Sequence, residues 1–425
     1  MRLVKKILKI VLLLAILAFA FWWFKNSPPD EIKISGPITL SPISDAINAV
    51  TPAGDYIAEA VYKTADDLPA YDEVILSADE KTAFIPTMDG SFWKIDVEAG
   101  TASHFVDVPL MAAGARRAPD NAEVIYFCAS YLFGVEYPQN ERVGLYRLDT
   151  ASKTITPLVI DVPQSDATGG EAKIFANNTG PSLRTADMNA GNSRALTFCN
   201  DLDVSADGKR IYFTEPFSYG RPTMGGGGTY REAITLGQNG RVWQYDLDTT
   251  EARLIAQNFI FPDGILIEDS GAGIEETLLV TETIQFRILR LSIGGDNAGE
   301  WSIVQENLPG MPDGMDRDTD GRIWVGIIKQ RSPVIDWIHG NPWIKPFFLR
   351  LPANLMPVSA ETSLMAFSKD GSTPLFYSLH DGSVLSDISV IVPGRNELFV
   401  AAFNREATGL FRMPYPLGLE LEGAN

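Results

Sequence analysis

Cysteine, histidine and positive charge are all scarce in this chain of 425 residues. It has 2 cysteines and 3 histidines, and no C-x-x-C pattern occurs, which argues against a structural zinc site. The net charge of −19 leaves no basic stripe to neutralise phosphates, so nucleic acid is not expected as a partner. Gly-x-Ser-x-Gly is also absent, and no Ser-His-Asp nucleophile is indicated.

One long apolar run, residues 10–24, stands near the N-terminus and follows several basic residues. Because Lys9 can extend its ammonium group to the bilayer surface, residues 7–24 approach the roughly 17 to 25 residues that cross a membrane. The preceding positive charge predicts a cytoplasmic N-terminus and a periplasmic, extracellular or lumenal folded domain. We expect a transmembrane signal-anchor at 1–25, a linker rich in Ser and Pro at 26–53, and a folded domain at 54–425.

The N-terminal segment and the two cysteines can each be interpreted in two ways. Ala18-Phe19-Ala20 can instead mark the cleavage site of a secretory signal, and in both cases the domain leaves the cytoplasm. Cys128 and Cys199 lie on predicted strand ends, where they can form a disulfide or remain buried and free.

Short strand patterns separated by turns recur through the rest of the chain at a period of roughly 40 to 50 residues, which is typical of a propeller. The clearest is a hairpin at 83–96, where an Asp-Gly turn separates two runs of alternating apolar residues. Related units follow at 124–148, 210–247, 277–293, from 322 onward and at 397–413. The sequence therefore predicts an all-β fold, a six-bladed β-propeller with an N-terminal transmembrane helix, in which residues 56–62 close the ring.

In four places a small polar residue precedes a short apolar stretch, and a second turn residue follows it seven positions later. Equal positions in separate blades lie at equal heights on a propeller axis, so we expect these side chains to converge at the channel mouth. Carboxylate and amide oxygens suit Ca²⁺, which takes about 6 to 8 oxygen ligands. The alternative is that these residues only form turns. The pairs are Asp72 with Asp79, Asn200 with Asp207, Asp263 with Ser270, and Asp313 with Asp320.

Several motifs occur in an order that identifies a family. The longest spans 198–215 and ends in Phe-Thr-Glu, and Pro-Asp-Gly occurs at 262–264 and again at 312–314. Others lie at 280–283 with Arg287, 307–314, 324–326, 342–345 and 378–381. Together they resemble the strictosidine synthase-like and adipocyte plasma membrane-associated proteins of the SMP-30/gluconolactonase/paraoxonase superfamily. The resemblance, over residues 68–413, implies a six-bladed propeller with a catalytic divalent metal, usually Ca²⁺.

The metal ligands that this resemblance implies coincide with the repeated polar residues. The asparagine of the family's Asn-Asp motif falls on Asn200, and two later ligands fall on Asp263 and Asp313. The acidic ligand of the first blade falls on Asp72, or on Glu73 if the register differs by one residue.

This chain departs from the family pattern at several positions. Asp263 replaces an asparagine, and Gly314 stands where paraoxonases have an amide ligand, so the site gains charge and loses one donor. The histidine that activates water in paraoxonase-like lactonases has no counterpart, because Ala113 is at that position. Strictosidine synthase depends on a glutamate where this chain has Ser386 and the shorter Asp387.

We therefore expect a Ca²⁺-dependent hydrolase of small-molecule esters or lactones, of the arylesterase or lactonase type. Asp201, Asp387 and His380 are candidates for the base that orients water, and Asp201 also suits a supporting or turn-forming role. The alternatives are a condensing enzyme of the strictosidine synthase type and a non-catalytic binding or scaffold propeller with a structural metal. The insertion at 329–366, rich in Trp and Phe, suits a partner or membrane surface, a lid, or packing on its own blade. The glycines at 225–228 are expected in a flexible connection between outer strands.

Overall fold

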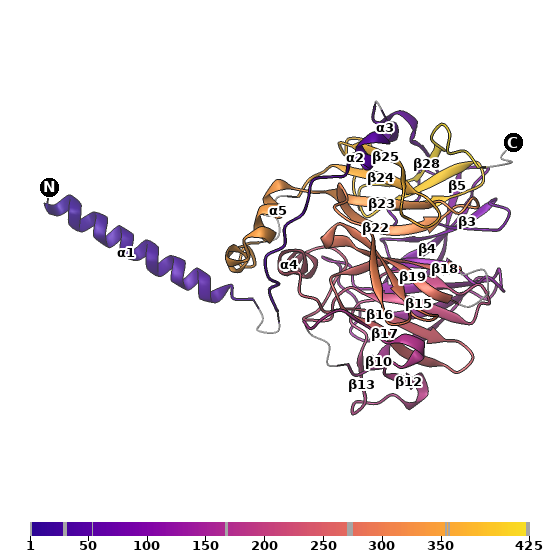
Figure 1. Cartoon of the computed structure of the whole chain (residues 1–425), viewed down its shortest axis with the longest axis horizontal. Helices are drawn as coiled ribbons and strands as arrows, with labels where there is room; N and C mark the ends of the chain where they lie inside the picture. The colour runs from indigo at the N-terminus through magenta and orange to yellow at the C-terminus, as the bar shows by residue number, and fades with distance from the viewer. Residues whose placement is uncertain are drawn as a thin grey trace.

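The computed structural model describes residues 2–28, 32–52, 54–165, 169–269, 275–352, 355 and 358–421. Most of the chain forms a β-rich body, and helix α1 (Arg2–Lys25) projects from it at the N-terminus (Figure 1). The segment Val4–Lys25 is long and apolar enough to cross a membrane and lies outside the body. Six successive antiparallel sheets form the body, so the predicted six-bladed β-propeller is confirmed.

The first three blades contain the described strands between residues 75 and 259, each blade in chain order from the axis outward. Blade 1 consists of β2 (Ile75–Leu76), β3 (Thr82–Thr87), β4 (Ser91–Asp96) and β5 (Thr101–Asp107). Blade 2 consists of β6 (Met111–Arg117), β7 (Val124–Ser130), β8 (Gly144–Asp149) and β9 (Thr154–Val159). Blade 3 consists of β14 (Leu202–Val204), β15 (Arg210–Glu215), β16 (Gly240–Asp246) and β17 (Glu251–Phe259), with β11 (Lys173–Ile174) and β12 (Ser182–Arg184) added outside β17. A separate ribbon pairs β10 (Asp161–Pro163) with β13 (Ser193–Ala195).

The other three blades complete the ring. Blade 4 consists of β18 (Pro262–Asp269), β19 (Glu275–Glu282), β20 (Arg287–Ser292) and β21 (Trp301–Gln305). Blade 5 consists of β22 (Gly310–Arg317), β23 (Ile323–Gln330), β24 (Thr362–Phe367) and β25 (Pro374–His380). Blade 6 consists of β26 (Ile388–Pro393), β27 (Glu397–Ala402), β28 (Leu410–Pro414) and β1 (Tyr62–Thr64).

An N-terminal strand closes the ring, but it is shorter than the sequence suggested. β1 pairs antiparallel with β28, which places Tyr62 opposite Arg412. The rest of the predicted closing segment is not a strand, because Tyr56–Ala60 form helix α3. The side chain of Asp55 caps this helix by accepting a hydrogen bond from the backbone N–H of Ala58, which favours the helix locally.

The blades pack face to face through apolar side chains, and the fully buried Trp243 and Trp324 are among the largest of them. The first strands of neighbouring blades contact one another around the axis, so the N-terminal ends of these strands share one mouth of the channel. A disulfide joins Cys128 on β7 of blade 2 to Cys199, just before β14 of blade 3. Cys128 and Cys199 therefore form a disulfide and are not buried free thiols.

Four helical segments cover part of one side of the propeller, next to α1 (Figure 1). We call them the cap; they are α4 (Gly227–Thr235), α5 (Pro333–Gly340), η4 (Pro342–Ile344) and α6 (Lys345–Phe348). They share a small apolar core around Ile234, Ile338 and Leu349. The other described helices are α2 (Asp45–Ala49), η1 (Ala176–Asn178), η2 (Thr185–Asp187) and η3 (Thr283–Gln285).

At the cap, the structure differs from two expectations drawn from the sequence. The glycines at 225–228 do not lie between outer strands, because β15 and β16 are the middle strands of blade 3, and Gly227 and Gly228 begin α4. The insertion at 329–366 does not pack only on its own blade, since α5 and α6 also contact α4.

Candidate metal and substrate site

All four predicted metal ligands lie on the wall of one cavity of about 400 Å³. Asp72 and Asn200 lie a few residues before the starts of β2 and β14. Asp263 and Asp313 lie near the starts of β18 and β22. These strands belong to blades 1, 3, 4 and 5, so the fold brings together residues that are far apart in sequence. The structure therefore places the four side chains where the repeat predicted them.

The three carboxyl groups face one another; Asp263 is buried, and Asp72 and Asp313 are half-buried. Burial raises the pKa of Asp72 to about 6 and that of Asp263 to about 7. Burial and the facing Asp263 carboxyl raise the pKa of Asp313 well above its usual range. Among the described residues, the leading charge effects on these three groups come from other carboxyl groups. Such a cluster requires protons or a cation, because buried like charges repel.

Hydrogen bonding shows which oxygens a cation could use. The Oδ1 atom of Asp72 is buried and has no hydrogen-bond partner among the described residues. Asp263 accepts a hydrogen bond from the hydroxyl of Thr283, at 3.0 Å, and also shares a side-chain hydrogen bond with Asp313. Together with the amide of Asn200, this donor set consists of oxygen ligands alone and fits a hard divalent cation.

The backbone of each ligand is held by the preceding blade, a feature that sequence analysis missed. The hydroxyl of Thr214 donates to the carbonyl of Asp263 at 2.8 Å, and the hydroxyl of Thr281 donates to the carbonyl of Asp313 at 3.0 Å. In the same way the Ser389 hydroxyl donates to the carbonyl of Asp72 at 3.3 Å. The backbone N–H of Gly114 donates to the carbonyl of Asn200 at 2.8 Å, which completes the pattern.

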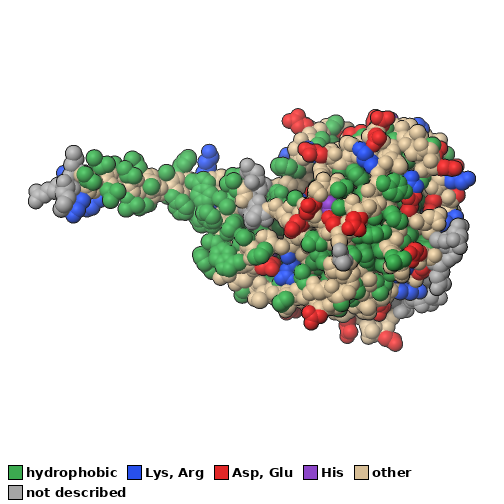
Figure 2. All heavy atoms as spheres, turned by 90° about the horizontal axis from the view of Figure 1, so that it is seen from above, with side chains coloured by type: hydrophobic (Ala, Val, Ile, Leu, Met, Phe, Trp, Pro, Cys, Tyr) green, Lys and Arg blue, Asp and Glu red, His purple; other side chains and the backbone are tan. Residues whose placement is uncertain are grey.

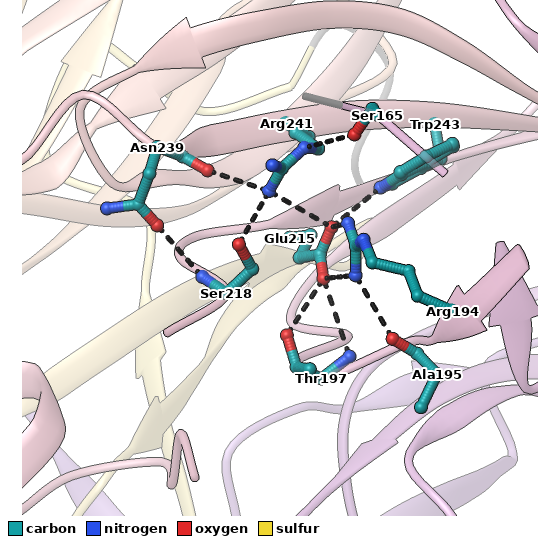
Figure 3. Close-up of polar contacts among 9 residues, drawn as sticks. All are labelled: Ser165, Arg194, Ala195, Thr197, Glu215, Ser218, Asn239, Arg241 and Trp243. Atoms are coloured by element: carbon teal, nitrogen blue, oxygen red, sulfur yellow. Dashed lines mark hydrogen bonds and ion pairs between the residues drawn. The ribbon is translucent and has the colours of Figure 1, made fainter. Parts of the chain in front are cut away.

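Thr214 and Thr281 had a signal in the sequence, because both begin a Thr-Glu dipeptide at the end of a second strand. Each glutamate is buried and paired with arginine. Glu215 forms a two-pronged contact with Arg194, in which both guanidinium nitrogens donate, at 2.8 and 2.7 Å, and the indole N–H of Trp243 donates to it at 3.0 Å (Figure 3). The repeated dipeptide thus fixes the strand end that supports the next ligand.

Asp201 does not line the cavity. Its Oδ1 accepts from the backbone N–H of Leu202 at 2.8 Å, and its Oδ2 accepts from that of Ile265 at 3.0 Å. Oδ1 therefore fixes the start of β14, and Oδ2 joins blade 3 to the inner strand of blade 4. Gly114 makes room for this carboxylate, because a Cβ at that position would lie 2.2 Å from Oδ1 of Asp201.

Below the cavity, Arg116 of blade 2 crosses the channel. Its guanidinium forms an ion pair with Glu73 at 2.6 Å and donates to the carbonyl of Met315, on the opposite blade 5, at 3.1 Å. Glu73 also accepts from the backbone N–H of Val74. Of the two alternatives for the first-blade ligand, Asp72 faces the cavity and Glu73 belongs to this arginine contact.

His380 is distant from the cavity, at the end of β25, the outermost strand of blade 5. Its Nδ1 contacts Asp55 at 2.5 Å, and its Nε2 accepts from the backbone N–H groups of Val384 and Leu385. With Asp55 and Asp381 it forms a group whose ligand atoms lie within 4.8 Å of one another. Because Asp55 also caps α3, these bonds give His380 a structural role.

Asp387 does line the cavity, and it has a partner that sequence analysis missed. The ammonium group of Lys329 lies 2.6 Å from its Oδ1, and the hydroxyl of Ser386 donates to its Oδ2 at 2.6 Å. Asp387 adopts a left-handed backbone conformation, with φ of 59°, which for a residue other than glycine is uncommon and is often associated with function. Ser386 is held in turn by the side-chain amide of Asn404.

The remaining cavity wall is largely apolar. Helix α4 and the segment before it contribute Met224, Tyr230 and Ile234, and α5 contributes Ile335. Phe198, Phe261 and Phe286 come from the propeller. Ala113, at the position of the paraoxonase histidine, is buried in the same apolar cluster as Phe198. The site thus combines an acidic floor with walls that suit an apolar substituent.

Comparison with known proteins agrees with this architecture. Residues 167–336 match the SMP-30/Gluconolactonase/LRE-like region. This propeller contains an SMP-30/gluconolactonase-like region. An adipocyte plasma membrane-associated protein from Danio rerio is 31% identical over 245 residues, which cover 54% of this chain and 53% of the relative. Strictosidine synthase-like 13 from Arabidopsis thaliana is 28% identical over 231 residues, covering 53% of this chain and 51% of the relative. The resemblance seen in the sequence is confirmed, and the match spans about half the length of these relatives.

A solved structure of a gluconolactonase from Xanthomonas campestris is similar to this chain in fold. It has a TM-score of 0.51 at 16% identity and covers 92% of this chain and 98% of the gluconolactonase. The SMP-30-like region extends from residue 167 into α5, so it includes Asn200, Asp263 and Asp313, whereas Asp72 and Asp387 lie outside it.

Proposed function

We propose that this protein is a membrane-anchored hydrolase of carboxylic esters or lactones that uses Ca²⁺ or another divalent cation. The observation that carries the proposal is the convergence of acidic side chains, with no ion-pair partner among the described residues, at the floor of an apolar cavity. The likeness to the SMP-30/gluconolactonase region supports a lactonase-type activity.

Asp72, Asn200, Asp263 and Asp313 would hold the cation. When bound, such an ion supplies a Lewis acid for a carbonyl oxygen and offsets the charge that develops on it. The hydrogen bonds from the preceding blades limit movement of the ligand backbones, so little reorganisation is needed as a substrate binds.

Asp387 is the residue of this chain best placed to act as a base. In the proposed reaction its carboxylate accepts a proton from water as the water oxygen bonds to the acyl carbon. The acyl–oxygen bond of the ester or lactone then breaks, and the proton is returned to the leaving alkoxide. Lys329 and Ser386 hold both carboxylate oxygens, and the apolar walls orient the substrate and exclude bulk water.

The domain is proposed to lie outside the cytoplasm, with α1 as the anchor and the N-terminus inside. The Cys128–Cys199 disulfide supports this location, because disulfides persist in oxidising compartments.

The test is hydrolysis of aryl esters and of lactones by purified full-length protein supplied with Ca²⁺, together with direct measurement of bound calcium. We expect Asp313→Ala to abolish calcium binding and to lower kcat/KM by at least about 100-fold. The matched control is Asp248→Ala, an exposed carboxylate that pairs with Lys209 on the surface. Absence of hydrolysis in the wild type, or full activity in Asp313→Ala, would contradict the proposal.

A strictosidine synthase-type condensation is the second candidate, favoured by one observation: Asp387 lines the cavity where that family has its glutamate. Product analysis with an amine and an aldehyde separates the two reactions, since condensation forms a C–N bond and hydrolysis consumes water.

A further inference from the structure

The cap is joined to the end of the anchor helix by direct contacts. The rings of Trp22 and Phe347 pack with their centroids 5.8 Å apart. Arg350 places its guanidinium 3.8 Å from the ring centroid of Trp23 and donates to the carbonyl of Trp23 at 2.9 Å. The cap therefore lies at the same level as the aromatic end of α1 (Figure 1).

The cap also has a large exposed apolar surface beside this junction. The side chains of Trp343 and Trp337 are 71% and 49% exposed, and their rings contact each other at 6.4 Å. Val334, 44% exposed, lies on the same helix as Trp337. Green side chains gather at the end of the helix and on the adjoining part of the body in Figure 2. An exposed patch of this kind indicates contact with a protein or a membrane.

Position distinguishes between these partners. Trp337 and Trp343 lie beside the end of α1 that carries Trp22 and Trp23, and tryptophan is typical of a bilayer interface, where the indole lies among the headgroups. The cations of this insertion do not face lipid, because Lys345 is buried, Lys329 pairs with Asp387 and Arg331 pairs with Asp336. The exposed aromatic side chains beside the anchor therefore favour a membrane-contacting surface at that place.

We propose that Val334, Trp337 and Trp343 of the cap insert into the interfacial layer of the same bilayer that α1 crosses. This inference rests on the membrane anchoring in the proposed function and is independent of the reaction catalysed. It gives the propeller a fixed orientation, with the cap towards the lipid. Helix α4 is then placed between lipid and cavity, because Tyr230 and Ile234 line both the cavity and a groove formed with Trp22 and Lys25.

The experiment measures the depth of single labelled cysteines in nanodiscs that hold one full-length chain each. The native cysteines are bonded to each other, so non-reducing labelling is confined to an introduced thiol. An environment-sensitive fluorophore is attached at Trp343→Cys, with Val334→Cys as a second cap position. Leu14→Cys reports the anchor, and Leu417→Cys, 96% exposed near the C-terminus, is the solvent control. Phosphatidylcholine–phosphatidylglycerol discs with and without doxyl-labelled lipid supply the quencher.

We expect both cap labels to be quenched at least about threefold more than the label at 417, because an interfacial side chain lies roughly 5–10 Å below the headgroup boundary. Quenching at 14 with none at 334 or 343 would overturn the inference and leave membrane anchoring intact. No quenching at any of these positions would overturn both. Quenching at only one cap position would also contradict insertion of the surface as described.

Discussion

At the scale of single residues, the contact between Lys329 and Asp387 has the clearest chemical consequence. The ammonium group fixes one carboxylate oxygen and Ser386 fixes the other, so the Asp387 side chain is held in one orientation beside the proposed cation ligands. The pairing cannot be inferred from neighbours in sequence, because Lys329 lies near the end of a strand of blade 5 and Asp387 precedes a strand of blade 6.

Replacing Asp387 by Asn should lower kcat for ester or lactone hydrolysis by about 10² to 10⁴, the usual contribution of a general base. Lys329→Met removes the charge that positions the carboxylate and should lower kcat by a smaller factor, whereas Lys329→Arg keeps a cation and should recover part of the loss. Steady-state kinetics on the three variants, with calcium binding measured in parallel, test this. An Asp387→Asn variant with normal kcat would exclude Asp387 as the base.

Glu215 provides a residue-scale prediction about stability and pH. Burial alone would raise its pKa, but Arg194, Arg241 and the Trp243 N–H outweigh burial and lower the pKa to about 2 (Figure 3). Glu215→Gln should therefore destabilise the fold by about 3 to 5 kcal/mol at pH 7, because it leaves buried guanidinium charge uncompensated.

Because the folded-state pKa is lowered, this stabilisation is fully present above the unfolded value of about 4.5 and is lost as the pH falls towards 2. Urea unfolding of wild type and variant at pH 7 and near pH 3 should show a smaller difference at the lower pH. Glu251→Gln, which removes a more exposed partner of Arg253, is the control and should cost about 1 kcal/mol or less. Equal effects of the two variants would contradict the role assigned to Glu215.

At the scale of elements, the first strands of the blades were the most predictable part of the fold. In blades 1, 3, 4 and 5 the repeated polar residue lies before or near the start of the first strand, so position in the repeat determines position at the channel mouth. The turn residue Ser270 lies outside the described residues. Predictions made from residue type alone did less well: His380 and Asp201 have suitable chemistry, but their remote partners Asp55 and Ile265 hold them away from the cavity.

The cap was hard to predict for a related reason. Gly227 and Gly228 have low intrinsic helix propensity, and α4 is held by packing against α5 and α6, which come from an insertion more than 90 residues later. Its helical structure follows from tertiary contacts between segments that no local pattern links.

The disulfide between blades 2 and 3 yields a prediction at this scale. It links residues separated by 71 positions, and closing a loop of that size in the unfolded chain should stabilise the fold by about 4 kcal/mol. Urea unfolding of the Cys128→Ala/Cys199→Ala double variant should show this loss, and addition of reductant should then have no further effect on it. A double variant as stable as the wild type would show that the bond contributes little.

At the scale of the whole molecule, a cation at the channel mouth would join blades 1, 3, 4 and 5 as well as serve the chemistry. Chelation should abolish hydrolysis, while the propeller stays folded by far-ultraviolet circular dichroism. An ion at about 100 times its Kd contributes about 2.7 kcal/mol, so Tm should fall by several degrees on chelation and recover when Ca²⁺ is added back.

Two outcomes of that experiment would redirect the interpretation. Hydrolysis that survives chelation would contradict a catalytic cation. Complete unfolding on chelation, in a protein without measurable turnover, would instead favour a binding or scaffold propeller with a structural ion.

Arg116, beneath the acidic floor of the cavity, also affects how molecules enter and leave the site. Arg116 reaches from blade 2 to the carbonyl of Met315 on blade 5, so its side chain lies across the axis below the cavity. We therefore expect substrate to enter and product to leave on the cap side, so that a product competes with the next substrate for the cavity.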